Sequence, residues 1–187
     1  MAVEHKTKSP GAVRALAVSA DGKQIFSAGA DRNIRLWELS MDIGLILVRA
    51  FQGGHDGVVT SIALLDPSDP RHVVSGSEGR SGGVWAKGDG GIKVWRASDG
   101  KCLLTTTKQT GDITAFHVCV DPGASGAAGE QQDEAAGAIG GVMSASKDGT
   151  VVEWAVEWSQ DAGGGGGSGG QGHTMQWKAG TLQGKRF

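Results

Sequence analysis

The chain has 187 residues, 33 of them glycine, and its 18 Lys and Arg nearly balance its 20 Asp and Glu. The glycine excess argues against a mainly helical protein, because Gly in a helix interior costs about 1 kcal/mol relative to Ala. A net charge of −2 provides no basic surface for nucleic acid or anionic lipid, and argues against both as partners. The longest apolar run, residues 43–48, is six residues, whereas a membrane-spanning helix needs about 20.

Two further features bear on the compartment. The first ten residues carry charges where a signal peptide would have its apolar stretch. Cys102 and Cys119 lack the spacing of zinc ligands and are too few for a disulfide framework. We therefore expect reduced thiols in an intracellular protein, cytoplasmic or nuclear, without a metal or another cofactor.

One order of elements occurs three times along the chain. An alternating apolar run comes first, then a small-residue strand, a turn, and a strand that ends in Trp. The alternating runs are 13–18, 59–64 and 113–118, and the Trp-ending segments are 27–37, 75–95 and 144–154. With outer strands at 44–51 and 101–107, this pattern predicts eleven strands and no helix. Asp-Gly pairs at 21–22, 99–100 and 148–149 suit tight turns between paired strands.

These segments resemble the WD40 repeat family, in which each repeat of about 40–45 residues supplies four strands to a β-propeller. The middle repeat carries the resemblance best, with Gly54-His55, then Ser75, then Trp95. The resemblance covers residues 11–157. It implies an all-β fold of three four-stranded antiparallel sheets, arranged as blades of an incomplete or open propeller.

Several features depart from the family pattern. None of the three tryptophans is followed by Asp, and successive tryptophans lie 58 and 59 residues apart. Each of the two later repeats must therefore hold extra residues, which we place in surface loops at 78–90 and 121–140. Both should be tolerated, because the entropic cost of closing a loop grows only logarithmically with its length.

We accordingly divide the chain into three parts. Residues 1–10 are a lead-in, and residues 158–187 form a Gly-rich flexible tail that could contribute one more short strand at 173–178. Between them lie the three repeats, at 11–53, 54–107 and 108–157.

In blades of this family a strand Ser or Thr, the Gly-His histidine, a turn Asp and the strand Trp can form a chain of hydrogen bonds. The resemblance assigns this structural network to His55, Ser75 and Trp95 in the middle repeat, to Ser27, Asp31 and Trp37 in the first, and to Ser144, Asp148 and Trp154 in the third. Asp89 is a weak candidate for the middle turn acid. The outer repeats lack the histidine, with Lys8-Ser9 and Lys108-Gln109 near its position, so we expect incomplete networks and less stable blades there.

Other chemistry finds less support in the sequence. A Ser, a His and an Asp invite a nucleophilic reading, but each occupies a repeat-determined position, and the Ser recurs in all three repeats. The Gly-rich residues 76–83 lack the order of a phosphate-binding loop. We therefore predict no catalytic residue. Trp85, inside the first insertion, either packs on its own blade or serves as a contact for a partner.

Closure of the propeller is the open question, because propellers typically have 4–8 blades. The sequence leaves three explanations: a fragment or truncated product without independent function, assembly with blades from another chain or from a second copy, or an open array. The resemblance implies a non-catalytic scaffold that binds other proteins. A hydrolase built on a propeller is the alternative.

Overall fold

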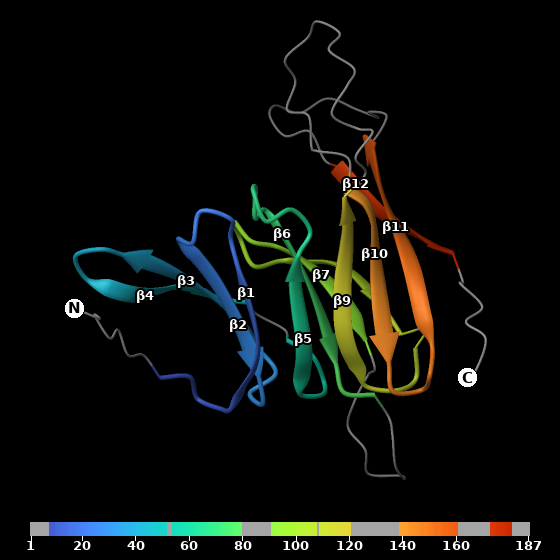
Figure 1. The fold of residues 1–187 in the computed structure, drawn as a ribbon, viewed down its shortest axis with the longest axis horizontal. Coiled ribbons are helices and arrows are strands. Elements are labelled where there is room, and N and C mark those ends of the chain that lie inside the picture. Colours follow the sequence, from blue (N-terminus) through green and yellow to red (C-terminus); the bar gives the residue numbers. More distant parts are fainter. Residues whose placement is uncertain are drawn as a thin grey trace, which may run out of the picture.

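The computed structural model describes residues 8–51, 54–79, 91–107, 109–120, 139–160 and 173–180. Within these residues the chain is all-β, with twelve strands and no helix (Figure 1). The strands are β1 (Val13–Val18), β2 (Gln24–Gly29), β3 (Ile34–Ser40), β4 (Gly44–Ala50), β5 (Val59–Leu64), β6 (His72–Ser77), β7 (Ile92–Arg96), β8 (Cys102–Thr106), β9 (Ile113–Val120), β10 (Ile139–Ser146), β11 (Val151–Gln160) and β12 (His173–Gly180). The described residues contain no helix long and apolar enough to span a membrane.

The strands form three four-stranded antiparallel sheets, as the sequence predicts. β1 to β4 make the first sheet, β5 to β8 the middle sheet and β9 to β12 the third, each in the order of the sequence. The expected twelfth strand is present as β12, which pairs with β11. β12 and the end of β11 lie in the segment 158–187.

Glycines at the predicted Asp-Gly turns take the conformation that such turns require. Gly22, Gly100 and Gly149 have φ values of 73°, 71° and 83°, in the left-handed region that costs other residues about 1–2 kcal/mol. Hairpins between neighbouring strands therefore form where the sequence places them.

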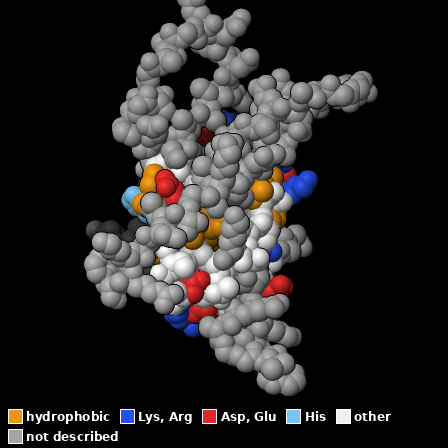
Figure 2. Space-filling model, turned by 90° about the vertical axis from the view of Figure 1, so that its right-hand side faces the viewer, with side chains coloured by type: hydrophobic (Ala, Val, Ile, Leu, Met, Phe, Trp, Pro, Cys, Tyr) orange, Lys and Arg blue, Asp and Glu red, His pale blue; other side chains and the backbone are white. Residues whose placement is uncertain are grey.

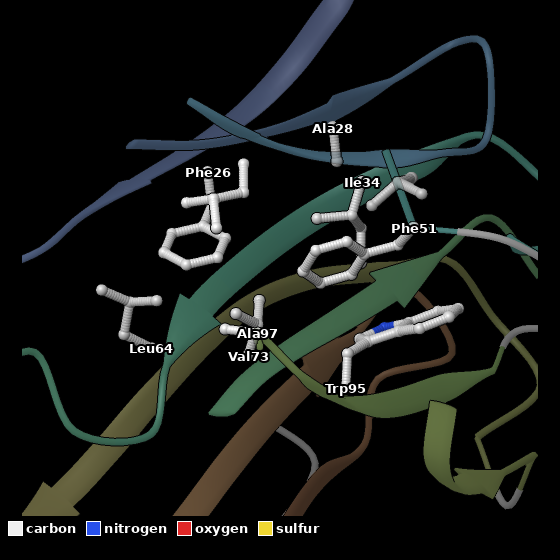
Figure 3. Packing of buried hydrophobic residues seen from close by; sticks show 10 residues of the cluster. Phe26, Ala28, Ile34, Phe51, Leu64, Val73, Trp95 and Ala97 are labelled. Atoms are coloured by element: carbon white, nitrogen blue, oxygen red, sulfur yellow. The ribbon is translucent and has the colours of Figure 1, made fainter. Parts of the chain in front are cut away.

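The sheets stack face to face, and each uses its two faces differently. Side chains alternate between the faces of a strand, so the strand register divides each sheet into a tryptophan face, which carries Trp37, Trp95 or Trp154, and an opposite face. The tryptophan face of the middle sheet, with Val73 and Trp95, packs on the opposite face of the first sheet, with Phe26 and Ile34 (Figure 3).

The second core repeats this arrangement one sheet further along. Val142 and Trp154 of the third sheet pack on Val74 and Val94 of the middle sheet. Seen from the side of the third sheet, apolar side chains are visible towards the centre, and charged side chains lie mostly around them (Figure 2). The middle sheet is thus the one sheet with described neighbours on both faces.

Candidate functional site

A short chain of hydrogen bonds joins the strands of the middle sheet. The indole Nε1 of Trp95 donates to Ser75 Oγ at 2.7 Å, and His55 Nε2 lies 2.7 Å from the same oxygen. Ser75 and Trp95 are fully buried and His55 nearly so. Burial makes these bonds matter, because an unsatisfied polar group in the interior costs about 1–3 kcal/mol.

The third sheet builds the same chain with a different residue. Trp154 Nε1 donates to Ser144 Oγ at 2.7 Å, and Ser144 Oγ donates to Gln109 Oε1 at 2.6 Å. The amide nitrogen of Gln109 donates in turn to Thr150 Oγ1 at 3.0 Å. The expectation that the third network is incomplete for want of a histidine is therefore wrong, because a buried glutamine supplies the missing acceptor and a donor as well.

The first sheet keeps the core of the network without that third partner. Trp37 Nε1 donates to Ser27 Oγ at 2.7 Å. Ser9 precedes β1 by four residues, as His55 precedes β5 and Gln109 precedes β9, but its hydroxyl accepts from Arg35 Nη1 at 3.4 Å. Asp31, the turn acid expected to join this network, forms an ion pair with Arg35 instead.

The turn acid of the third sheet, Asp148, organises the loop before β9. Its Oδ2 accepts from the backbone N–H of Thr110 at 2.8 Å, and its Oδ1 from that of Thr150 at 2.9 Å. Partial burial raises the pKa of Asp148, but the hydrogen bonds from Thr150, Thr110 and Gly111 outweigh it and hold the pKa well below its ordinary value. Asp148 is therefore a carboxylate that fixes two neighbouring connections to each other.

A second carboxylate connects the middle and third sheets. Asp112 Oδ1 accepts from the backbone N–H of Gly79 at 2.9 Å, and Oδ2 binds Lys147 Nζ at 2.7 Å. The hydrogen bond and the charge of Asp112 raise the pKa of Lys147. Asp112 is buried and Lys147 is largely exposed, so the pair links the interior to the surface.

These contacts gather five connections at one end of the sheets, which we call the loop end. It comprises the described parts of the connections β2–β3, β4–β5, β6–β7, β8–β9 and β10–β11. The His55 N–H donates to Arg32 O at 3.1 Å, which joins the first two connections, and Lys147 N donates to Asp112 O at 2.9 Å, which joins the last two. The loop end is thus a hydrogen-bonded surface that spans all three sheets.

Arg32 is the unusual residue of the loop end. It is exposed, and its φ of 65° makes it the one described non-glycine residue with positive φ. The corresponding turn of the third sheet has Gly149 at this place, five residues before the tryptophan. Gly54 lies so close to the Arg32 carbonyl that a side chain there would collide with it. Backbone strain of this kind persists only where the surroundings enforce it.

The Ser75 and His55 pair has the distance of a nucleophile and its base, but not their surroundings. Both side chains are buried, and Ser75 Oγ already accepts from Trp95. The equivalent Ser144 binds a glutamine, which cannot act as a base. Among the described residues no group of three His, Cys, Asp or Glu side chains is placed to hold a metal.

Some residues of interest from the sequence lie outside the described part of the chain. These are Trp85, Asp89, and most of both insertions, since residues 80–90 and 121–138 are not described. The sequence does not indicate Asp112 or Arg32, and it places Gln109 near the histidine position without indicating a role for it. A signal existed for Gln109, because it precedes its strand by four residues as His55 does.

Comparison with known proteins agrees with this arrangement. The family model described as "WD domain, G-beta repeat" matches residues 3–38 and 46–96, which contain β1, β2, most of β3 and β4, and β5 to β7. A curated protein, "Nuclear distribution protein nudF 2" of Penicillium rubens, is 30% identical over 115 residues, which is 57% of this chain. The chain spans about a quarter of that relative, 24% of its length.

The third sheet lies outside the matched segments but repeats their construction. It has the same strand order, the same Trp to Ser hydrogen bond, and its tryptophan face packs on the sheet before it. With the matched segments and the three equivalent sheets, the chain belongs to the WD40 repeat family.

Proposed function

We propose that this protein is a non-catalytic scaffold that binds another protein through the loop end. WD40 repeats generally serve as protein-binding domains. The geometry of this chain supports the loop end as the surface that contacts the partner.

Arg32 is the observation that carries the proposal. A non-glycine residue in the left-handed region costs about 1 kcal/mol or more, and glycine, which avoids this cost, occupies the equivalent turn as Gly149. Arg32 makes no described ion pair or side-chain hydrogen bond within the fold. An arginine in a strained turn whose exposed side chain has no described partner within the fold is expected where it contacts another protein, because Arg is enriched at interface hot spots.

The rest of the loop end suits the same role. Exposed Asp56 and Lys147 flank the surface with charges of both signs, and rigid loops lose little conformational entropy when a partner binds. The Asp112 and Asp148 contacts supply that rigidity. A mixed-charge surface of this kind favours a protein with complementary charges over a nucleic acid.

Arg32→Gly tests the proposal, because it separates stability from binding. It should raise the free energy of unfolding by about 0.5–1 kcal/mol by removing the strain, and it should weaken the capture of partners by the full chain in quantitative affinity purification. Arg14→Gly, at an exposed position of β1 outside the loop end, is the control and should leave capture unchanged.

Deletion of residues 80–90 tests whether the insertion between β6 and β7 contributes to partner binding. The deletion should remove a subset of the captured proteins while the circular dichroism spectrum keeps its β-sheet form. Identical partner sets for the wild type, Arg32→Gly and the deletion would refute the proposal.

A hydrolase remains the rival hypothesis, and the pairing of His55 with Ser75 is the observation in its favour. Turnover of ester, phosphate or peptide substrates that disappears in both His55→Ala and Ser75→Ala, with the fold retained, would support it. We expect no turnover from any of the three proteins, because neither side chain reaches solvent.

A further inference from the structure

The outermost strand of the first sheet, β4, combines an unpaired edge with an apolar surface. β4 ends the strand order of its sheet and pairs with β3 alone among the described strands. In Figure 1 the β3 and β4 hairpin lies at the far left, away from the other two sheets. Five large apolar residues of the hairpin are exposed: Met41, Ile43, Ile46, Leu47 and Val48.

Natural sheets protect such edges, and β4 has this protection only near its end, where the register shifts between Leu47 and Arg49. Edge strands commonly carry Lys, Pro or inward-pointing charges that prevent pairing with another chain. Residues 43–48, Ile-Gly-Leu-Ile-Leu-Val, contain no charge and no proline. The corresponding strand of the middle sheet, β8, follows Lys101, contains three polar or thiol side chains, and has no large exposed apolar residue.

The strand register shows which backbone groups of β4 point outwards. Leu39 N donates to Lys23 O at 2.8 Å, so the backbone groups of Leu39 face β2 and not β4. Leu39 lies opposite Leu45, and Trp37 lies opposite Leu47. Because the N–H and C=O of one residue point to the same side and alternate along a strand, those of Leu45 and Leu47 face the open edge.

The charges at the two ends of β4 select an antiparallel partner of the same sequence. Asp42 precedes the apolar run and Arg49 follows it. Two copies paired antiparallel bring each Asp42 to the end of the strand where the other copy carries Arg49, whereas parallel pairing would place like charges together. Opposite charges directly across two strands are stabilising, and like charges are destabilising.

We propose that β4 is a self-association site, at which two copies of this chain pair edge to edge and form one continuous eight-stranded sheet. In one register with two-fold symmetry, Leu45 of each copy lies opposite Leu47 of the other copy. The two outward-facing residues of each copy then form hydrogen-bonded pairs across the interface. In that register Ile46 faces its own counterpart in a non-hydrogen-bonded pair, whose Cα atoms lie about 4.5 Å apart. The inference does not depend on the proposed function, which concerns the loop end.

Disulfide trapping tests the register. In the full chain with Cys102→Ser and Cys119→Ser, Ile46→Cys should form a disulfide-linked dimer under mild oxidation, since the predicted separation lies within the range that disulfides span. Leu16→Cys is the control, because Leu16 is 62% exposed on β1 of the same sheet. The yield for Ile46→Cys should exceed that for Leu16→Cys at least about tenfold.

Sedimentation equilibrium of the unmodified chain tests the association itself. The wild type should show a concentration-dependent monomer and dimer equilibrium, and Leu47→Lys should weaken it by about tenfold or more, equivalent to about 1.4 kcal/mol. Leu16→Lys should leave it unchanged, and circular dichroism verifies that each variant folds.

Two results would overturn the inference. A wild-type protein that remains monomeric at all concentrations would exclude self-association at β4. The same result is expected if the edge binds a strand from another protein instead of a second copy. A dimer that Leu16→Lys disrupts and Leu47→Lys does not would place the interface on the tryptophan face of the first sheet.

Discussion

Gln109 takes the structural role that a histidine, His55, has in the middle sheet. It accepts from Ser144 and donates to Thr150, the two functions that a neutral histidine divides between its ring nitrogens. Because Gln109 Oε1 can only accept, Ser144 must be the donor. Ser75 occupies the equivalent position in the middle sheet, between Trp95 and His55.

The Gln109 network leads to a prediction about stability. Gln109→Leu should lower the free energy of unfolding by about 1–3 kcal/mol, because it leaves the buried Ser144 hydroxyl without an acceptor. Gln109→His should cost less, since it restores a possible acceptor. Urea titration followed by tryptophan fluorescence measures both, and Gln24→Leu at a half-buried position serves as the control. A Gln109→Leu protein as stable as the wild type would contradict the network.

His72 leads to a prediction about pH. Burial, together with the positive charges of Arg96 and Arg71, lowers the pKa of His72 from 6.5 to about 4. As the pH falls from 6.5 to 4, the unfolded chain takes up a proton that the folded chain does not, so stability should fall across this window. The urea midpoint should decrease between pH 7 and pH 5 in the wild type and less in His72→Gln. Equal decreases of the urea midpoint in the wild type and in His72→Gln would show that His72 is not the source of the pH dependence.

At the scale of the elements, the packing of neighbouring sheets depends on small residues. Gly76 of β6 lies against the side chain of Ile113 of β9, and a Cβ at position 76 would overlap the Cγ2 of that isoleucine. The backbone carbonyl of Ile113 also accepts a hydrogen bond from Thr60 of β5. The strand that begins the third sheet, β9, therefore packs directly on the middle sheet.

A double-mutant cycle tests the contact between Gly76 and Ile113. Gly76→Ala should destabilise the protein by about 1–3 kcal/mol through overpacking. Ile113→Ala alone should cost about 2–5 kcal/mol through the cavity it leaves. The double variant should cost less than the sum, because each change relieves the other. Additive costs would show that the two residues do not meet.

At the scale of the whole molecule, the middle sheet should be the most stable part. Both of its faces are packed, whereas each outer sheet has one described neighbour, and in stacked repeats stability is approximately a sum of terms between neighbours. Hydrogen exchange should therefore be slowest in β6 and β7. Phe26→Ala should cost about 3–5 kcal/mol and speed exchange in the first sheet more than in the third.

The exposed Leu16 supplies the control for the exchange experiment. Leu16→Ala changes the same sheet at a surface position and should leave the exchange pattern unchanged. A uniform acceleration over all three sheets in Phe26→Ala would show instead that the molecule unfolds as a single unit.

The sequence predicts local features of this fold better than contacts between sheets. Alternation and Asp-Gly turns depend on neighbours in the chain, so the strands and the turns at Gly22 and Gly149 were predictable. The bond between Asp112 and Gly79 joins different sheets, and no pattern around either residue indicates it. The strained turn at Arg32 was also not predictable, because the sequence there has no glycine to mark a positive φ.

The stacking of the tryptophan faces fixes the order in which the apolar faces are covered while the protein is translated. The first sheet is covered by the sheet translated after it, so the face that carries Phe26 has no packing partner until Trp95 has been made. At about 5 to 20 residues per second, that interval lasts roughly 3 to 14 s on the ribosome. We therefore expect the nascent chain to expose this apolar face for seconds and to bind chaperones that act during translation.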